Sequence, residues 1–584
     1  APEIGNLASG GVKFTNAFST GTVCSPSRTT IITGIKSYTA GTGHHRSSYP
    51  IPEHIKGFPY YLRQQGYYTT NNSKTDYNVR NPAAFIRESW DESSNKAGWQ
   101  GRKTGQPFFA VFNFNDSHQA NTMTDSYADY EESVLDKLFP DEKIAEDAFT
   151  MPPFYRDSPE MRRHLGRVYN SLKLTDKKIG DLLKKLEQDN LRDDTIIFLF
   201  ADHGQGIPRG KTNGINLGYR VPFVIWFPEK YRFLSPWGTK STSDELITFE
   251  DLAPTLISLS GGKIPDHLSG RILMGDDRSP LAGHVVLSSD RSGNGVDMVR
   301  TVTDGKFIYS RNYFTYMPEL RYLRYMEISE IKQQMRRDFE NGLLDTEAQR
   351  MLFDQRPPEY LFDIENDPWE LVNLAGSDEY KPMLTRFRNL LKEEVLAARD
   401  IMYLPEYEIS KVSETSTPFE YRLQSGAYRL DEIYDAASLA GFKGADIITR
   451  QLHFLKSDDK IVRYWASVGL INQSGGDLSA FTKVLTNHID DDYLPVSVTI
   501  AAIVYKLNSD KAAREILKVS CLNDDPHIAL MAINYMLYAE NKAPFIETIK
   551  QVLLIPDRPD PVKTACTDFL GSLGLIPNNP GHYN

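Results

Sequence analysis

Two apolar runs mark strands in the first part of the chain. Residues 108–114 (FFAVFNF) and residues 195–202 (TIIFLFAD) are apolar at nearly every position, and residues 161–188 between them carry a helical pattern. Strands that are apolar at consecutive positions are buried on both faces, which is typical of parallel sheets covered by helices. The alternation of such strands with helices from residue 12 to about residue 228 therefore predicts an α/β fold.

Both runs end in polar, ionisable residues. The first is followed by NDSH, which ends at His118, and the second ends at Asp202 and is followed by His203 and a glycine. In open α/β sheets, ligands bind outside the carboxyl ends of the strands. These residues therefore belong to the predicted functional site.

The pattern changes after residue 281. Strand-like segments rich in aromatic residues (MVRTVTDGKFIYSRNY and YLFDIENDPWELVNLAG) flank a charged helical stretch at residues 327–353. This predicts a smaller antiparallel sheet in a subdomain of residues 282–425, beside a larger α/β domain of residues 1–281.

Residues 426–584 have the pattern of helices without strands. An acidic residue precedes an apolar helix at Asp459, Asp492, Asp525 and Asp560, with spacings of 33, 33 and 35 residues. A repeat of this length, with apolar helices such as VSVTIAAIVYKL and HIALMAINYML, is typical of an α-solenoid. The region is therefore predicted to be an α-helical HEAT-like repeat domain, and a plain helical bundle is the alternative.

Composition narrows the choice of function. The chain has 584 residues, 40% hydrophobic and 24% charged, which suits a globular protein that is too long for one hydrophobic core. A net charge of -11 argues against nucleic acid as the main partner, because phosphate binding needs a basic surface. The apolar runs are too short to cross a bilayer, so no membrane span is expected. Of the three cysteines, Cys521 and Cys566 lie on apolar helix faces and are expected to be buried thiols.

The N-terminal residues show no signal peptide. Residues 4–14 (IGNLASGGVKF) already have the pattern of a helix that leads into a strand. We therefore expect that the sequence begins inside a domain.

The segment CSPSR, from Cys24 to Arg28, carries the most specific chemistry. It places a thiol and a guanidinium four residues apart at a predicted junction between a strand and a helix. Free N–H groups at a helix N-terminus favour an anion. The segment is therefore expected to receive an anionic ligand, and the alternative is a buried cysteine in a turn with Arg28 on the surface.

Cys24, Pro26 and Arg28, with Thr33 and Gly34 after them, match the C-x-P-S-R pattern and the following T-G of the formylglycine-dependent sulfatases. The resemblance implies that a formylglycine-generating maturation enzyme oxidises Cys24 to formylglycine. The hydrated aldehyde then attacks sulfur, and the adduct releases sulfate by collapsing to the aldehyde, which a serine or cysteine adduct cannot do. The resemblance also implies the alkaline-phosphatase-like sulfatase sandwich for the first domain.

The same resemblance assigns the metal ligands. Residues 195–204 (TIIFLFADHG) match the family's strand and D-N/H-G turn, so Asp202 and His203 are expected to bind a divalent cation together with the modified Cys24. Oxygen ligands suit Ca²⁺, with Mg²⁺ as the alternative. Related sulfatases open with a strand that ends in two acidic metal ligands, and we expect this strand to precede Ala1.

Three further catalytic residues follow from the resemblance. Lys211 in GIPRGKTNG resembles the lysine that bridges the sulfate, and His118 resembles the general acid toward the leaving oxygen. Lys74 in TTNNSKTDYN resembles the lysine of the family's G-K-W-H segment, which neutralises developing charge. The alternatives are a solvated loop lysine for Lys211 and a core histidine for His118. The chain departs from the family at Asp76, where the G-K-W-H segment has its histidine, and this indicates a different leaving-group environment.

The run GHHRSSYPIP and the GIPRGK loop resemble the bacterial branch related to N-sulfoglucosamine sulfohydrolase, whose members act on sulfated polysaccharide fragments. This implies a sulfated oligo- or polysaccharide as substrate, bound by His44, Arg46 and Asp76, and a periplasmic or secreted location. Arg46 offers a planar fork for a carboxylate or a second sulfate, and His44 can donate to a hydroxyl. Alternatively, Arg46 pairs with a surface acid and His44 only packs.

Two other functions remain open from the sequence. One keeps the fold and hydrolyses phosphate or phosphonate esters, although the single-metal pattern favours sulfate. The other is a sulfated-glycan binding protein that has lost the metal or the modified cysteine. Mass spectrometry of the peptide that contains Cys24 separates a converted residue from an unconverted thiol.

Overall fold

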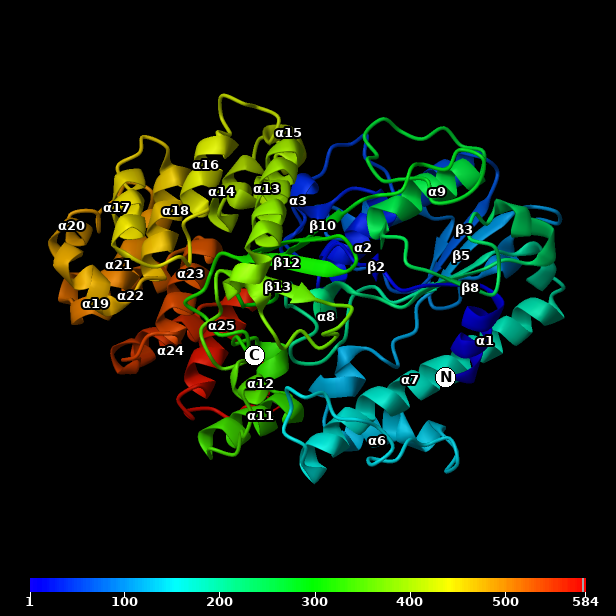
Figure 1. Cartoon of the computed structure of the whole chain (residues 1–584), viewed down its shortest axis with the longest axis horizontal. Helices are drawn as coiled ribbons and strands as arrows, with labels where there is room; N and C mark the ends of the chain where they lie inside the picture. Colours follow the sequence, from blue (N-terminus) through cyan, green and yellow to red (C-terminus); the bar gives the residue numbers. More distant parts are fainter. Residues whose placement is uncertain (580–581, 584) are drawn as a thin grey trace. The chain divides into compact units, whose positions relative to one another are not determined.

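The computed structural model describes residues 1–579 and 582–583, and Figure 1 shows their path from blue to red. Contacts within the chain divide it into two compact units. Unit 1 comprises Ala1–Ser288, Thr301–Ile308 and Phe362–Val372, and unit 2 comprises Ser289–Arg300, Tyr309–Leu361 and Asn373–Asn584. The domain boundaries predicted at residues 281 and 425 stay predictions.

The first sheet of unit 1 has the strand order β6-β7-β1-β8. β6 (Ile197–Phe200) and β1 (Val12–Phe14) run antiparallel to β7 (Phe223–Trp226), and β1 runs parallel to β8 (Ser241–Ser243). The predicted α/β class is confirmed, but this sheet is mixed rather than parallel, because β7 enters it in the opposite direction.

A second sheet of unit 1 has the order β4-β3-β5 and is parallel throughout. Its strands are β4 (Glu92–Ser93), β3 (Tyr68–Asn72) and β5 (Phe108–Phe112). A short parallel pair joins β2 (Ala17–Phe18) to β9 (Ile247–Thr248). β5 and β6 therefore correspond to the two apolar runs that the sequence marked as strands.

Helices cover both faces of the first sheet. On one face, Phe223 and Ile225 of β7 pack in a core that includes Leu252 of α9 (Leu252–Leu259). On the other face, the alternate residue Val224 packs with Leu7 of α1 (Pro2–Gly10) and Ile179 of α7 (Pro159–Gln188). Because successive strand residues point to opposite faces, this alternation identifies three layers with the sheet in the middle.

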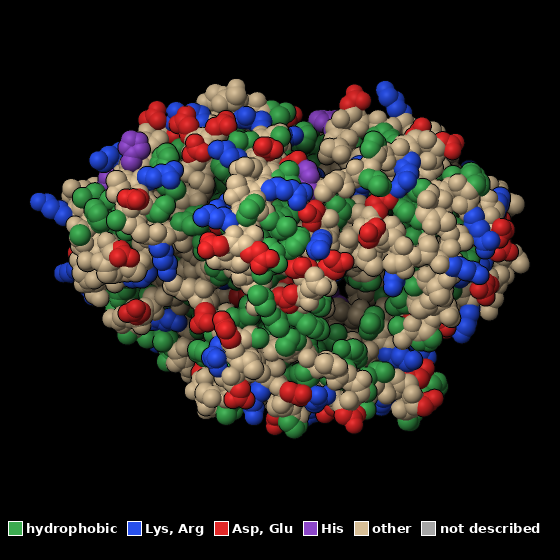
Figure 2. All heavy atoms as spheres, viewed as in Figure 1, with side chains coloured by type: hydrophobic (Ala, Val, Ile, Leu, Met, Phe, Trp, Pro, Cys, Tyr) green, Lys and Arg blue, Asp and Glu red, His purple; other side chains and the backbone are tan. Residues whose placement is uncertain are grey.

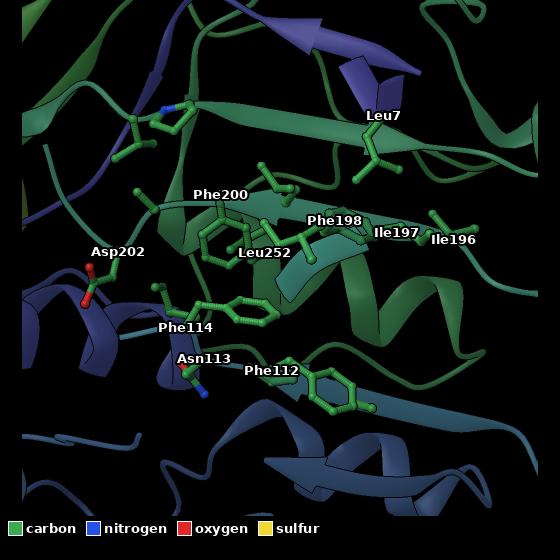
Figure 3. Close-up of a pocket in the computed structure, with 18 of the residues that line it drawn as sticks. Leu7, Phe112, Asn113, Phe114, Ile196, Ile197, Phe198, Phe200, Asp202 and Leu252 are labelled. Atoms are coloured by element: carbon green, nitrogen blue, oxygen red, sulfur yellow. The ribbon is translucent and has the colours of Figure 1, made fainter. Parts of the chain in front are cut away.

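A cavity of about 1610 Å³ lies beside β5 and β6. Among the described residues, β5 and β6 are the last strands of their sheets, so that each bonds to a neighbouring strand on one side only. Figure 3 shows Phe112 and Phe114 lining the cavity from one side and Ile197, Phe198 and Phe200 lining it from the other. This explains why both strands are only half-buried, although their sequences are those of fully buried strands.

The predicted smaller sheet corresponds to a four-stranded sheet in the order β10-β11-β12-β13. Its strands are β10 (Val285–Ser289), β11 (Val299–Thr303), β12 (Phe307–Asn312) and β13 (Glu359–Asp363). The antiparallel direction expected for these strands stays a prediction.

The C-terminal part of unit 2 is helical, as the sequence predicts. Helices α16, α18, α21, α23 and α25 each pack against the next in this series, and the remaining helices pack beside them. Figure 1 shows them in yellow to red. Their bounds are α16 (Leu430–Ala437), α17 (Ala445–Phe454), α18 (Lys460–Ile471), α21 (Leu494–Asn508), α22 (Lys511–Cys521), α23 (Pro526–Leu537), α24 (Ile546–Leu554) and α25 (Asp560–Gly571).

Helix capping accounts for two of the four recurring aspartates. The Asp459 carboxylate accepts hydrogen bonds from the backbone N–H groups of Ile461 and Val462 at the start of α18, and Asp525 accepts from His527 at the start of α23. A capping aspartate satisfies N–H groups that have no partner within the helix. The description of the region as a HEAT-like repeat stays a prediction.

The surface is mixed in charge. On the face of the described chain that Figure 2 shows, basic and acidic side chains are interspersed. In the described part of the chain, no helix is both long enough and apolar enough to cross a membrane.

Candidate active site

Cys24 is the first residue of α2 (Cys24–Thr33) and is only 2% exposed. The preceding residue, Val23, is in an extended conformation and has no polar side chain with which to cap the helix. The first N–H groups of α2 therefore keep their partial positive charge at the position of the thiol. The thiol therefore lies in a buried corner that favours a negative charge, and the anionic ligand expected for the CSPSR segment stays a prediction.

Four side chains from separate segments converge on Cys24. The distance from Sγ is 3.4 Å to Nε2 of His203, 3.5 Å to Nζ of Lys74 and 3.6 Å to Nζ of Lys211. His118 also hydrogen-bonds to Cys24. The structure thus brings together residues that lie as far apart in the sequence as positions 24 and 211.

These neighbours change the ionisation of Cys24. Burial by itself raises the pKa of the thiol, but Lys211, His203 and the hydrogen bond from His118 outweigh burial and the opposing charge of Asp202. The pKa of Cys24 is therefore lowered well below its usual value. The pocket stabilises a negative charge at Sγ, which is the property that an anion-binding site requires.

Arg28 is fixed in position by three acceptors. Its Nε donates to Oδ2 of Asp202 at 2.7 Å, and its Nη1 donates to Oδ1 of Asn113 at 2.8 Å and to the carbonyl oxygen of Lys74 at 3.3 Å. Burial opposes ionisation of Asp202, but Arg28, His203 and the two lysines hold the pKa of its carboxyl well below the usual range. Asp202 is therefore an anion at neutral pH.

The segment around Lys211 is held by a buried carboxylate. Glu370 is fully buried, and its two oxygens accept from the backbone N–H groups of Asn216 at 2.8 Å and Leu217 at 3.0 Å. The Lys211 N–H itself donates to the carbonyl oxygen of Gln205 at 2.7 Å. These bonds hold the backbone at and after Lys211, and its buried ammonium group lies beside Cys24 rather than in solvent.

Cys24, Asp202 and His203 offer three donor atoms within 4.8 Å of one another. Nδ1 of His203 lies 2.9 Å from the carbonyl oxygen of Gly204, which can only accept, so Nδ1 carries a proton and Nε2 faces Cys24. An ionised carboxylate and an imidazole nitrogen are suitable metal ligands. Ca²⁺ prefers oxygen ligands, so Asp202 suits it directly, and a formylglycine at position 24 would replace the sulfur with an oxygen.

His118 is oriented by the backbone. The N–H of Ala120 donates to Nδ1 of His118 at 3.3 Å, so that Nε2 carries the proton of the neutral ring. The hydrogen bond to Cys24 favours the charged form, but burial together with Lys211 and Lys74 outweighs it and lowers the pKa of His118. In the free protein the ring is neutral at neutral pH.

Of the three residues predicted to bind the saccharide, Arg46 and Asp76 are in contact with each other. Arg46 and Asp76 form a two-point ion pair, with Nε to Oδ1 at 2.9 Å and Nη2 to Oδ2 at 3.2 Å. Arg46 is the more exposed partner, with 64% of its side chain accessible against 14% for Asp76. His44 is instead buried, at 7% exposure, and the neighbouring His45 interacts with the charge on Cys24.

The sequence did not mark three residues that lie at or near the site. Asn113 is the first residue after β5 and bonds to Arg28, Asn78 bonds to the backbone at His44, and the charge of Cys24 acts on His45. Asn113 could have been predicted, because it is a polar residue at the end of an apolar strand.

The apolar cavity reaches this corner. Arg28, Lys74, His118, Asp202 and His203 are among the residues that line it. In Figure 3, Asp202 and Asn113 lie toward one end and the phenylalanines of β5 and β6 fill the middle. The charged corner is therefore continuous with the space between the two strand edges.

This chain is similar to known sulfatases. The Sulfatase family model matches residues 1–262. An ulvan-active sulfatase of Formosa agariphila is 32% identical over 446 residues, which is 70% of this chain and 73% of that protein. Human N-sulphoglucosamine sulphohydrolase is 24% identical over 311 residues, covering 47% of this chain and 60% of that protein. Among solved structures, a 2-O GAG sulfatase has a TM-score of 0.48 at 18% identity, covering 68% of this chain and 87% of that one.

Proposed function

Because the chain belongs to the sulfatase family of sulfuric ester hydrolases, we propose that it removes sulfate from a sulfated oligo- or polysaccharide with a formylglycine made from Cys24. The observation that carries the proposal is the convergence of Lys74, Lys211 and His118 on the buried Cys24 at the start of α2. Cations and N–H donors fixed around a buried nucleophile are the environment that stabilises charge on sulfate oxygens. The names of the relatives support a saccharide with its sulfate on oxygen or nitrogen.

The cationic residues bind the sulfate in this proposal. Lys74 and Lys211 lie within 3.6 Å of Sγ, so a sulfate that meets the nucleophile contacts both ammonium groups. Arg28 is held by Asp202 and Asn113 and keeps the nucleophile's side of the site positive. Fixed charges of this kind need no rearrangement when charge develops in the transition state.

His118 donates to the atom that leaves. Its Nε2 carries the proton and faces Cys24, so the ring can donate a hydrogen bond to the bridging oxygen or nitrogen of the substrate. An anionic sulfate beside the ring favours its protonated form, which raises the proton-donating power of His118 only when substrate is bound.

The modified residue supplies the nucleophile. When formed, the hydrated aldehyde provides a hydroxyl for attack on sulfur and releases sulfate by returning to the aldehyde, so that one water is consumed per turnover. The thiol at position 24 already lies where this hydroxyl must act, in contact with Lys74, Lys211 and His203.

We also infer that Asp202 and His203, with the modified residue 24, hold a divalent cation, Ca²⁺ or Mg²⁺. When bound, such an ion supplies a further positive charge that polarises a sulfate oxygen. The position of His203 Nε2 beside Cys24 and the ionised state of Asp202 support this role. A sulfated polymer is met outside the cytoplasm, so a periplasmic or secreted location and a separate maturation enzyme are part of the proposal.

Sulfate release and the mass of the Cys24 peptide test the proposal together. We expect the purified protein to release sulfate from ulvan oligosaccharides or from N-sulfoglucosamine, and the Cys24 peptide to show the mass loss of conversion to an aldehyde. Full activity with an unconverted Cys24 would remove the formylglycine from the proposal. Faster hydrolysis of aryl phosphates or phosphonates than of every sulfate ester would instead favour the phosphate or phosphonate hydrolase.

Metal removal is an independent test. EDTA should abolish sulfate release, and adding Ca²⁺ or Mg²⁺ back singly should show which ion restores it. As a readout other than activity, the added ion should raise the unfolding temperature of the wild type but not of Asp202→Ala. Activity that survives exhaustive chelation would contradict the metal assignment.

A further inference from the structure

Residues 41–48, which we call the histidine loop, are fastened to the helix that begins with Cys24. The N–H of Arg46 donates to Oγ of Ser25 at 3.0 Å. Asn78 donates through Nδ2 to the carbonyl oxygens of Thr42 at 2.9 Å and His44 at 2.7 Å. The loop is therefore held at both of its ends close to the nucleophile.

Asn78 connects the loop to α2 directly. Its own N–H donates to Oγ1 of Thr29 at 2.7 Å, and its Oδ1 accepts from the N–H of Ser48 at 2.8 Å. Asn78 is 1% exposed, so these bonds are shielded from water. A buried amide that uses both its donor and its acceptor on one loop fixes the path of that loop.

The backbone adopts an unfavourable conformation where the loop meets the segment after Lys74. Arg46, Ser48 and Asp76 have φ values of 55°, 56° and 53°, in the left-handed region that residues with a Cβ rarely occupy. The ion pair between Arg46 and Asp76 joins two of these positions. Strained positions of this kind persist where the surrounding structure fixes them and are concentrated at functional sites.

His45 lies in this loop between the buried His44 and the ion-paired Arg46. Its side chain is half-buried, and the charges that act on it are those of Arg46, Cys24, Asp76 and Lys211. The next residue, Arg46, donates its backbone N–H to Ser25, the neighbour of Cys24 in α2, and this bond holds the His45 segment near the nucleophile. His44 is buried, and its carbonyl oxygen accepts from Asn78.

The chain lacks the histidine of the family's G-K-W-H segment and has Asp76 in its place. A family histidine would stand there, two residues after Lys74, but Asp76 is engaged by Arg46. Asp76 therefore cannot offer the donor that an imidazole offers. The histidine loop places an imidazole beside the same residues from a different part of the sequence.

We propose that His45 is a substrate-binding residue that hydrogen-bonds the sugar on the leaving-group side of the sulfate, and that the Arg46–Asp76 pair positions it. This inference rests on the proposed function. The ligand is a hydroxyl or ring substituent of a sulfated saccharide, because a neutral imidazole both donates and accepts hydrogen bonds. An aryl sulfate has no such group and does not use the contact.

The test compares two substrates on His45→Ala and His45→Gln. With the ulvan oligosaccharide or N-sulfoglucosamine that the wild type hydrolyses, kcat/KM should fall by about ten- to a hundredfold in His45→Ala, as expected for one lost hydrogen bond to substrate. His45→Gln should recover part of the loss, because an amide also donates and accepts. With 4-nitrophenyl sulfate, both variants should stay within about twofold of wild type.

His54→Ala is the matched control. His54 is an exposed histidine of the same unit whose ring packs against His267, and its loss should leave both substrates unaffected. Unchanged saccharide kcat/KM in His45→Ala, or an equal fall on both substrates, would overturn the binding role. A wild type that hydrolyses no sulfated saccharide would instead overturn the proposed function itself.

The positioning step has its own test. If the ion pair acts through His45, Asp76→Asn should lower saccharide kcat/KM in the wild-type background but should have little further effect in His45→Ala. The unfolding temperature of each variant shows that the protein remains folded. Additive losses in the double variant would mean that Arg46 and Asp76 do not act through His45.

Discussion

Charged side chains are buried in both units of this protein, but they are arranged in opposite ways. Around Cys24, the cations Arg28, Lys74 and Lys211 gather near the carboxylate of Asp202 and a thiol. Three cations exceed the two negative charges of Asp202 and the ionised Cys24. An anion that entered the site would therefore be attracted to it.

The buried charges of unit 2 neutralise one another. Arg300 is fully buried and bonds to Asp290 at 3.1 Å and to both oxygens of Asp400. The carboxylate of Asp297 accepts from two further buried arginines, Arg321 and Arg356, so that three arginines meet three carboxylates in all. Such groups have exchanged water for each other, so they fix the packing and leave no net attraction for a ligand.

The comparison shows that burial of charge does not identify a functional site. An excess of one sign, placed at a helix N-terminus and beside a cavity, distinguishes the corner around Cys24 from the ion pairs of unit 2. Substitutions around Cys24 should therefore change catalysis, and substitutions in the buried ion pairs of unit 2 should change stability.

Removing Cys24 gives the largest expected effect. Cys24→Ala should lower sulfate release by about 10⁴-fold or more, because loss of a nucleophile removes the covalent route. The control is Cys521→Ala, since Cys521 is fully buried in α22 and touches the sulfur of Met536. Initial rates of sulfate release per folded molecule are the measurement, and a Cys24→Ala enzyme with substantial activity would contradict the assignment.

Breaking the Arg300 cluster should act on stability instead. Arg300→Met leaves Asp290 and Asp400 buried without their cation, which costs about 3–5 kcal/mol. Lys392→Met breaks an exposed pair with Asp435 in the same unit and should cost about 1 kcal/mol or less. Urea unfolding measures both, and specific activity per folded molecule should be unchanged. Equal effects of the two variants would contradict the comparison.

Asp290 gives unit 2 a pH-dependent stability. Burial and the nearby Asp400 raise its pKa to about 7 against the attraction of Arg300. The folded state therefore holds a proton that the unfolded state has lost, so stability falls as pH rises from about 4 to about 7. Asp290→Asn should remove this part of the pH dependence, on the order of a few kcal/mol, when urea unfolding is compared at pH 5 and pH 8. A variant with the wild-type pH slope would exclude Asp290 as its source.

The resemblance to the sulfatases could mark these residues because its motifs lie in short segments. Cys24 and Arg28 share one helix, and Asp202 and His203 follow one strand. The structure brings the two segments together, and the roles assigned to the residues stay predictions. The apolar runs likewise predicted β5 and β6.

What the sequence could not predict depends on contacts between distant segments. Nothing in GTGHHRSS distinguishes the buried His44 from His45, because the path of the loop depends on hydrogen bonds between its backbone and Asn78, more than thirty residues later. The direction of β7 and the half-buried state of β5 and β6 also arise from tertiary packing. Periodicity reports which residues are apolar but not which strand edges remain open.

Asn113 should give the smallest effect. Its Oδ1 accepts from Nη1 of Arg28, while its Nδ2 donates to Oδ1 of Asn71 and to the carbonyl oxygen of Asn72. Asn113→Ala leaves Arg28 bonded to Asp202 and, at 3.3 Å, to the carbonyl oxygen of Lys74, but removes the shorter of the two bonds that hold Nη1. One hydrogen bond to a charged group corresponds to about 1–2 kcal/mol, so kcat should fall by about five- to thirtyfold with little change in KM.

The matched control is Asn72→Ala, because the side-chain amide of Asn72 bonds to the carbonyl oxygens of Asn95 and Ala97 and not to Arg28. If both variants lost stability to a similar degree but only Asn113→Ala lost kcat, the orientation of Arg28 would be the cause; equal losses of kcat would show that Asn113 only supports the strand end.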